Sequence, residues 1–388
     1  MLQLCVSQQI NKNPFSFKAT GIRVYSFEEA IYHVYHYWRE SVDDLLSDGM
    51  IAWVGEIGHS YLASRMKEMA KEEQFTKRIL DFLGLTPYFS KVELDTLKST
   101  LKAWESRREW EKLKERADYL ASRGEPGKAL ALYKRALQFN ENAQILNNMG
   151  VVYMQLSQPK DALRQLTRAL TLEPKNMDIL LHYIEAAILS GNFDNAAGAL
   201  VKAEARDPNC ADIPFLRGLM SCARKNFQEA LEYFGKAIAQ DPTVPYYVYK
   251  MADVHMEMRQ FDKALECLKA FQASEKDATY YAKEAELYAS AGDIPAAIKS
   301  MEQAADLSDA DSISSASIWA GLGGYHRQNY EPKKGEDAIK KALAIAPDNN
   351  LVQLENARIK KGLGRSKEYQ AALSDIINRF KEKYREEI

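Results

Sequence analysis

The chain of 388 residues has little of what membrane, secreted and nucleic-acid-binding proteins need. It has no apolar run of 18 or more residues, so no transmembrane helix and no membrane partner are expected. Its 52 Lys and Arg nearly balance 54 Asp and Glu, which argues against a protein that binds the nucleic-acid backbone through a basic surface. The first residues lack a basic segment followed by a long apolar one, so no secretory signal is expected.

Cysteine is also scarce. The four cysteines lie far apart, without CxxC or zinc-finger spacing, at Cys5, Cys210, Cys222 and Cys267. Neither disulfides nor a structural zinc is therefore expected, and a reducing cytoplasm is the default compartment. The composition, 46% hydrophobic and 27% charged, is that of a folded soluble protein.

Known catalytic motifs are missing as well. The sequence contains no HExxH, no GxSxG, no kinase motif set and no Rossmann fingerprint. His33 and His36 could bind a metal together with His59, but no Asp, Glu or Cys stands at a ligand spacing beside them. We interpret His33 and His36 as partly exposed polar members of an aromatic helix. The sequence thus predicts no enzyme activity, no cofactor and no bound metal.

What the sequence does contain is a repeat of about 34 residues. Small residues recur in three columns, in steps of 33 to 38 residues. The columns are Ala117, Gly150, Ile184, Gly218, Ala252, Ala285 and Gly323; Ala129, Ala162, Ala196, Ala230, Ala264, Ala297 and Gly335; and Ala136, Ala169, Ala203, Ala237, Phe271, Ala304 and Ala342. Ala or Gly fills 19 of these 21 positions, where chance would place about four. Because paired helices approach most closely through such residues, the columns predict a stack of antiparallel helix pairs.

The unit resembles the tetratricopeptide repeat (TPR), a helix–turn–helix of 34 residues. The seventh unit carries the most complete signature, with Trp319, Leu322, Gly323 and Pro347. The resemblance extends over about residues 110–349. It implies a mainly α fold, a right-handed α-solenoid of about seven TPR units followed by capping helices.

The sequence predicts four parts. Residues 1–24 form a short strand pair or extended segment, because apolar residues alternate at Leu2, Leu4 and Val6, at Phe15 and Phe17, and at Ile22 and Val24. Residues 25–108 form a small helical domain, with helices from Ser26 through Leu46 and at about 49–57, 60–71, 74–83 and 90–116. Residues 109–349 are the seven TPR units. Residues 350–388 form a C-terminal capping helix pair.

The resemblance also implies a function. TPR proteins bind partners in a concave groove lined mainly by the second, fifth, ninth and twelfth positions of each unit. The chain is thus expected to be a non-catalytic scaffold or adaptor for a protein or peptide partner. The groove residues that we expect are Phe215, Leu219, Tyr246, Tyr249, Asp253, Met256, Asn147, Asn148 and Lys114.

Some TPR proteins grip the C-terminal carboxylates of chaperones in a clamp of Lys, Asn and Arg. Lys114 and Asn148 match two clamp positions. Asp118 stands where the clamp has Asn, and Asp178 and His182 stand where it has Lys and Arg. Because the two acidic residues would repel a carboxylate, chaperone binding by such a clamp is not expected.

Two alternatives remain open. The chain could be a regulatory subunit of a larger assembly that binds through its N-terminal domain and convex face. It could also be an enzyme whose unrecognised site lies in residues 25–108. The sequence identifies neither the partner nor the oligomeric state.

Overall fold

The computed structural model describes residues 13–271, 276–308, 313–347 and 349–386. These residues are mainly helical, and the chain divides into two compact units, Met1–Val152 and Tyr153–Ile388. Across the described ranges no helix combines the length and the apolar character needed to cross a membrane. The domain limits at residues 24, 108 and 349 stay predictions.

The first unit begins with a minimal antiparallel sheet. Strand β1 (Phe15–Ser16) pairs with β2 (Arg23–Val24), with Phe15 opposite Val24. This is the strand pair predicted at Phe15 and Val24, and the expected alternation at residues 2–6 lies outside the described residues.

Five helices follow, and their boundaries correct two expectations. They are α1 (Phe27–His36), α2 (Asp48–Glu56), α3 (Ser60–Met69), α4 (Phe75–Leu83) and α5 (Lys91–Glu105). Ser26 caps α1 as expected, since its hydroxyl accepts a hydrogen bond from the Glu29 backbone N–H. The helix ends at His36 and not at Leu46, which adopts the left-handed conformation with φ 59°.

The single helix expected over residues 90–116 is also wrong. It is two helices, because α5 ends at Glu105 and α6 starts at Glu109. The side chain of Glu111 accepts a hydrogen bond from the backbone N–H of Arg108 at 2.9 Å, which satisfies a free donor at the start of the new helix. The aromatic core of this unit includes Trp104, whose ring lies 4.8 Å from Phe75 and 5.3 Å from Trp38.

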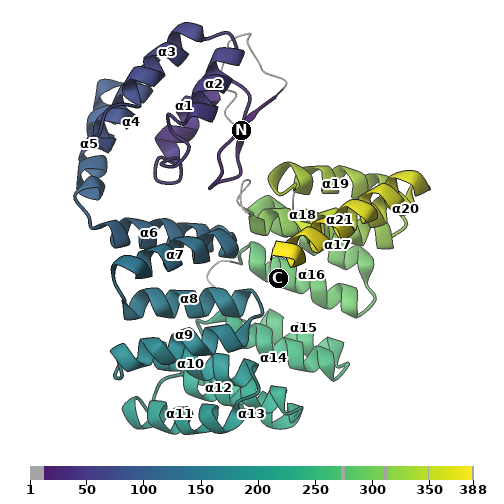
Figure 1. The fold of residues 1–388 in the computed structure, drawn as a ribbon. Coiled ribbons are helices and arrows are strands. Elements are labelled where there is room, and N and C mark those ends of the chain that lie inside the picture. The colour runs from purple at the N-terminus through teal and green to yellow at the C-terminus, as the bar shows by residue number, and fades with distance from the viewer. Residues whose placement is uncertain (1–12, 272–275, 309–312, 348, 387–388) are drawn as a thin grey trace. The chain divides into compact units, whose positions relative to one another are not determined.

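From α6 onward the helices alternate as first and second members of pairs (Figure 1). The first members are α6 (Glu109–Ser122), α8 (Ala143–Gln155), α10 (Met177–Leu189), α12 (Asp212–Ala223), α14 (Pro245–Glu257), α16 (Ala278–Ser290), α18 (Ile313–Gln328) and α20 (Asn350–Gly362). The second members are α7 (Pro126–Phe139), α9 (Pro159–Leu172), α11 (Phe193–Arg206), α13 (Phe227–Gln240), α15 (Phe261–Ala270), α17 (Ile294–Leu307), α19 (Pro332–Ile345) and α21 (Ser366–Glu386). The last pair is the expected C-terminal pair.

One residue in the turn of every pair adopts a left-handed conformation. These residues are Gly124, Ser157, Gly191, Lys225, Arg259, Gly292, Tyr330 and Gly364. The next residue donates its backbone N–H five residues back, as from Asn192 to Ala187 at 2.8 Å, which is the helix-ending Schellman pattern. Because four of the eight are not glycine, a search for glycine finds only half of these turns.

The columns of small residues lie where the helices cross. Every one of the 21 positions is buried except Phe271. A Cβ added to Gly335 would lie 2.9 Å from the Gly323 carbonyl oxygen, so α18 and α19 meet at a distance that only glycine permits. Phe271 escapes this constraint because α15 ends at Ala270, before the crossing. The predicted helical repeat is confirmed.

Candidate protein-binding surface

Three pairs of successive first helices in the second unit pack on one another. Helix α10 packs on α12, α14 on α16, and α18 on α20. Each also packs on the second helix of its own pair, which buries the opposite side. The free side of α10, α12, α14 and α16 is called here the first-helix face. Six of the expected groove residues belong to two of these helices, α12 and α14.

Phe215 is not a surface residue. Its side chain is only 4% exposed, and its ring lies 4.8 Å from Tyr247 and 5.5 Å from Phe234. Gly218 makes this packing possible, since a Cβ there would lie 2.5 Å from the Phe234 ring. The expectation that Phe215 offers free surface is wrong, because the ring fills the space between α12, α13 and α14.

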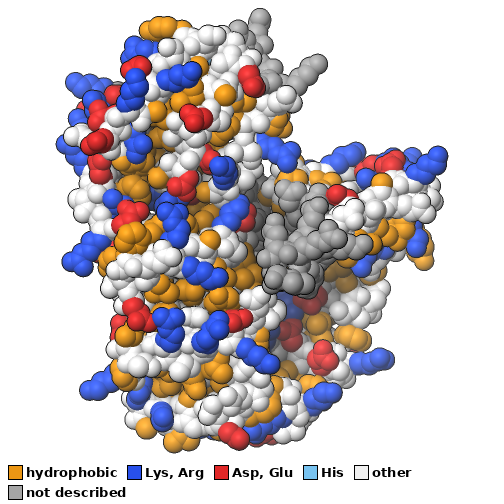
Figure 2. All heavy atoms as spheres, viewed as in Figure 1, with side chains coloured by type: hydrophobic (Ala, Val, Ile, Leu, Met, Phe, Trp, Pro, Cys, Tyr) orange, Lys and Arg blue, Asp and Glu red, His pale blue; other side chains and the backbone are white. Residues whose placement is uncertain are grey.

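Tyr246 does offer free surface. Its side chain is 44% exposed, and the ring lies 5.3 Å from that of Phe215. The Lys250 ammonium lies 5.3 Å from the ring centroid, and partial burial raises the pKa of the Tyr246 hydroxyl. Leu219 and Cys222 are half-buried on α12 at the edge of the same core. Figure 2 shows that hydrophobic side chains reach the surface in patches between charged ones along the repeats.

Tyr249 and Met256 lie one repeat interface further on. Both are half-buried against a core formed by Ala252, Ala264, Leu268 and Tyr280. Burial raises the pKa of Tyr249 to about 12, so its hydroxyl stays protonated at neutral pH. These two residues present less surface than Tyr246 and join α14 to α15 and α16.

Asp253 already has intramolecular partners. It pairs with Lys250 on its own helix at 3.3 Å and with Lys283 on α16. Lys283 also pairs with Glu286 at 2.7 Å. The predicted groove residue Asp253 thus holds two first helices together, which leaves it less available to a partner than the sequence suggests.

Glu185 is a residue that the sequence reasoning did not select. Its half-buried carboxyl has a raised pKa because burial penalises the charge, with Asp212 adding to the effect and Lys250 opposing it. Within the described ranges it forms no hydrogen bond and no ion pair. It occupies the ninth position of the third unit, so the rule that selected the other residues would have found it.

The neighbours of Glu185 add to the negative character of α10 and α12. Asp212 accepts a hydrogen bond from the Tyr247 hydroxyl at 2.6 Å. Burial lowers the pKa of His182, against the opposing charges of Asp178 and Asp212, so this imidazole is largely neutral at pH 7. The region therefore combines carboxylates with an uncharged histidine.

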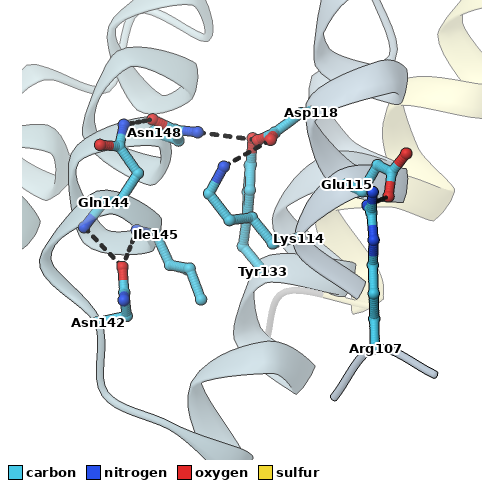
Figure 3. Close-up of polar contacts among 9 residues, drawn as sticks. All are labelled: Arg107, Lys114, Glu115, Asp118, Tyr133, Asn142, Gln144, Ile145 and Asn148. Carbon is cyan, nitrogen blue, oxygen red and sulfur yellow. Dashed lines mark hydrogen bonds and ion pairs between the residues drawn. The ribbon is translucent and has the colours of Figure 1, made fainter. Parts of the chain in front are cut away.

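Two of the three candidates of the first unit, Lys114 and Asn148, bind the same carboxylate, that of Asp118 (Figure 3). Asp118 accepts hydrogen bonds from Lys114 at 2.7 Å, from Asn148 at 2.8 Å and from the Tyr133 hydroxyl at 2.5 Å. Asn148 accepts a further bond from Gln144 at 2.9 Å, and Asn147 is buried at 5% exposure. The Asp118 carboxylate thus already accepts hydrogen bonds from Lys114 and Asn148. The C-terminal carboxylate of a partner would have to compete with it for these two side chains.

The described residues offer little for catalysis or metal binding. None of them forms a group of three or more His, Cys, Asp or Glu that could hold a metal. His33 stacks on Phe17 with ring centroids 3.9 Å apart, and burial lowers its pKa to about 3. Burial raises the pKa of the free thiols of Cys210, Cys222 and Cys267, which disfavours reactive thiolates. That the chain has no enzyme activity and no cofactor stays a prediction.

Comparison with known proteins agrees with the repeat geometry. A tetratricopeptide-repeat family model matches residues 153–213 and 223–287, and a second matches residues 190–245. Residues 153–287 of the chain thus contain tetratricopeptide repeats. TPR arrays serve in general as protein-interaction scaffolds, and the fold is typically non-catalytic.

Curated relatives share only part of their length with this chain. The BBSome complex member BBS4 of Bos taurus is 29% identical over 154 residues, which cover 38% of this chain and 29% of that protein. A probable UDP-N-acetylglucosamine–peptide N-acetylglucosaminyltransferase, SPINDLY, of Hordeum vulgare is 30% identical over 159 residues, 39% of this chain and 17% of that one. The match thus spans less than a third of either relative.

A solved structure covers a larger share of the chain. The crystal structure of a tetratricopeptide repeat protein from Parabacteroides merdae aligns with 66% of this chain and 99% of that one, at 19% identity and a TM-score of 0.42.

Proposed function

We propose that this protein is a non-catalytic scaffold or adaptor, and that its first-helix face binds a protein or peptide partner. The observation that supports this proposal is the exposed ring of Tyr246, which lies 5.3 Å from the buried ring of Phe215. Tyrosine is enriched at interface hot spots because it combines a large apolar ring with a polar tip. A reducing, cytoplasmic location fits such a role and is part of the proposal.

Binding would bury what Tyr246 now exposes. Covering an aromatic side chain of this size contributes about 1–3 kcal/mol. Phe215 supports the site from below, since its ring packs against Tyr246 and holds it in place. Tyr249 and Met256 extend the surface towards α16, whereas Asp253 fixes the spacing of α14 and α16.

The test is to replace Tyr246 and to measure partner binding. In an affinity purification with quantified co-purifying proteins, Tyr246→Ala should reduce the specific partner by about tenfold or more. Tyr233→Ala is the matched control, because this tyrosine belongs to the second helix α13. If Tyr246→Ala captured every specific partner as well as the unmodified chain, the proposed face would be wrong.

The alternative of a regulatory subunit has one observation in its favour. Tyr35 and Phe89 stack at 3.9 Å on the first unit, and Tyr32, at 37% exposure, lies against His36. This cluster is a second aromatic surface, and loss of partner with Tyr32→Ala but not with Tyr246→Ala would favour the regulatory subunit.

A further inference from the structure

The charges of the second unit are distributed unevenly between its two helix layers. The first helices α10, α12, α14 and α16 contain seven Asp or Glu and three Lys or Arg. The second helices α11, α13, α15 and α17 contain eight and six. The acidic excess therefore lies mainly on the layer that carries Tyr246.

The three basic residues of these first helices are already paired. Arg217 pairs with Glu204 of α11 at 2.8 Å, so its charge points to the second helices. Lys250 and Lys283 pair with Asp253, and Lys283 pairs with Glu286. No cation of the four helices remains to pair directly with the carboxylates of α10 and α12.

Glu185 is the carboxylate for which this lack of a pairing cation matters most. A partly desolvated carboxylate without a hydrogen bond or ion pair is unfavourable, and its cost is relieved when a cation reaches it. Lys250 acts on Glu185 through its charge, yet the described part of the chain contains no ion pair between them. The first-helix face thus has an unfilled position for a positive group.

Lys250 links this position to the aromatic part of the surface, because its ammonium lies 5.3 Å from the Tyr246 ring centroid and its charge also acts on Glu185. The charge of Glu185 acts on the Tyr246 hydroxyl, as do those of Lys250 and Asp253. A ligand in contact with both therefore needs an apolar group over the Tyr246 ring and a cationic group a short distance away. A peptide segment with a Lys or Arg near an apolar residue meets both requirements.

We propose that the partner segment bound by the first-helix face is basic, with a Lys or Arg side chain that pairs with Glu185 and an apolar side chain that covers Tyr246. This inference rests on the proposed function, because it names the chemistry of the partner at the same surface. Electrostatic complementarity of this kind favours basic segments and rejects acidic ones.

Selection from an unbiased peptide library tests this chemistry without knowledge of the partner. A random twelve-residue display library is panned on the full chain, and selected peptides are synthesised with a fluorophore for anisotropy titrations. The selected peptides should be enriched in Lys or Arg. Glu185→Gln should weaken their binding by about tenfold, and higher salt should weaken it as well. Glu232→Gln, which removes the same charge from the exposed side of α13, should change binding less than twofold.

The outcomes separate this inference from the proposed function. If binding falls with Tyr246→Ala but not with Glu185→Gln, or if the selected peptides are neutral or acidic, the face binds partners and the basic chemistry is wrong. If no selected peptide responds to Tyr246→Ala, both are wrong. Equal thermal stability of the variants and the unmodified chain, or a higher one, shows that lost binding is not lost folding.

Discussion

Two carboxylates on first helices of the array, those of Asp118 and Glu185, differ in their hydrogen bonding. Asp118 on α6 accepts hydrogen bonds from three side chains, all from the first unit. Glu185 on α10 has been partly removed from water and, among the described residues, has no such partner. The same helical scaffold therefore satisfies one negative charge internally and leaves the other unsatisfied.

The difference shows where binding is expected in a repeat protein. A carboxylate that is fully hydrogen-bonded contributes to stability and holds its donors away from a ligand. A partly buried one without a partner lowers stability, and such a cost is commonly found at functional sites. The Asp118 region is thus interpreted as structural and the Glu185 region as a binding surface.

The largest expected effect tests which aromatic residues of α12 and α14 are structural. Phe215→Ala removes a buried ring from between α12, α13 and α14, and should lower the free energy of unfolding by about 3–5 kcal/mol. Tyr246→Ala removes an exposed ring and should cost about 1 kcal/mol or less. Chemical denaturation of both variants measures the difference. Equal losses would show that Tyr246 is also part of the core.

A smaller effect tests whether the hydrogen bonds around Asp118 stabilise the fold. Asp118→Ala leaves the buried Tyr133 hydroxyl without its acceptor, and also frees Lys114 and Asn148, so it should destabilise the protein by about 1–3 kcal/mol. Asp161→Ala is the comparison, because that carboxylate forms a surface ion pair with the exposed Arg164, and its loss should cost less than about 1 kcal/mol. Denaturant unfolding of both variants provides the measurement. If Asp118→Ala were no worse than Asp161→Ala, the hydrogen bonds around Asp118 would not be structural.

Much of the fold could be predicted from the sequence because close helix packing leaves a strong signature. Only Ala or Gly fits where two backbones nearly touch, as at Gly323 and Gly335, so the pattern of small residues gives the repeat directly. The turns at Lys225 and Tyr330 were harder to see. The left-handed conformation there is imposed by the ends of the flanking helices and not by a glycine.

The candidate surface was less predictable, since position within a repeat does not fix the direction of a side chain. Phe215 has a groove position, but the space above Gly218 is filled by Phe234, and the Phe215 ring packs inward against it. The partners of Asp118 come from α6, α7 and α8, so no local pattern reveals them. Glu185 could have been found from its position, but its lack of a partner is a three-dimensional property.

The smallest expected effect is the change in stability when the unpaired charge of Glu185 is removed. Because burial raises the pKa of this carboxyl in the folded state above its ordinary value of 4.5, the native protein is penalised at any pH where the group is ionised in the unfolded chain. Glu185→Gln removes the charge at constant shape and should therefore raise the melting temperature at pH 7 by a degree or so, on the order of what a few tenths of a kcal/mol produce. The gain should shrink as the pH falls towards 4.5 and vanish below it, where both states are protonated.

Calorimetric melts of Glu185→Gln and Glu232→Gln from pH 4 to pH 8 give the comparison, since Glu232 lies exposed on α13 and its replacement should show no such pH-dependent gain. A melting temperature that drops at pH 7 on replacing Glu185 would mean that its carboxylate is satisfied within the fold, and the contrast with Asp118 would disappear.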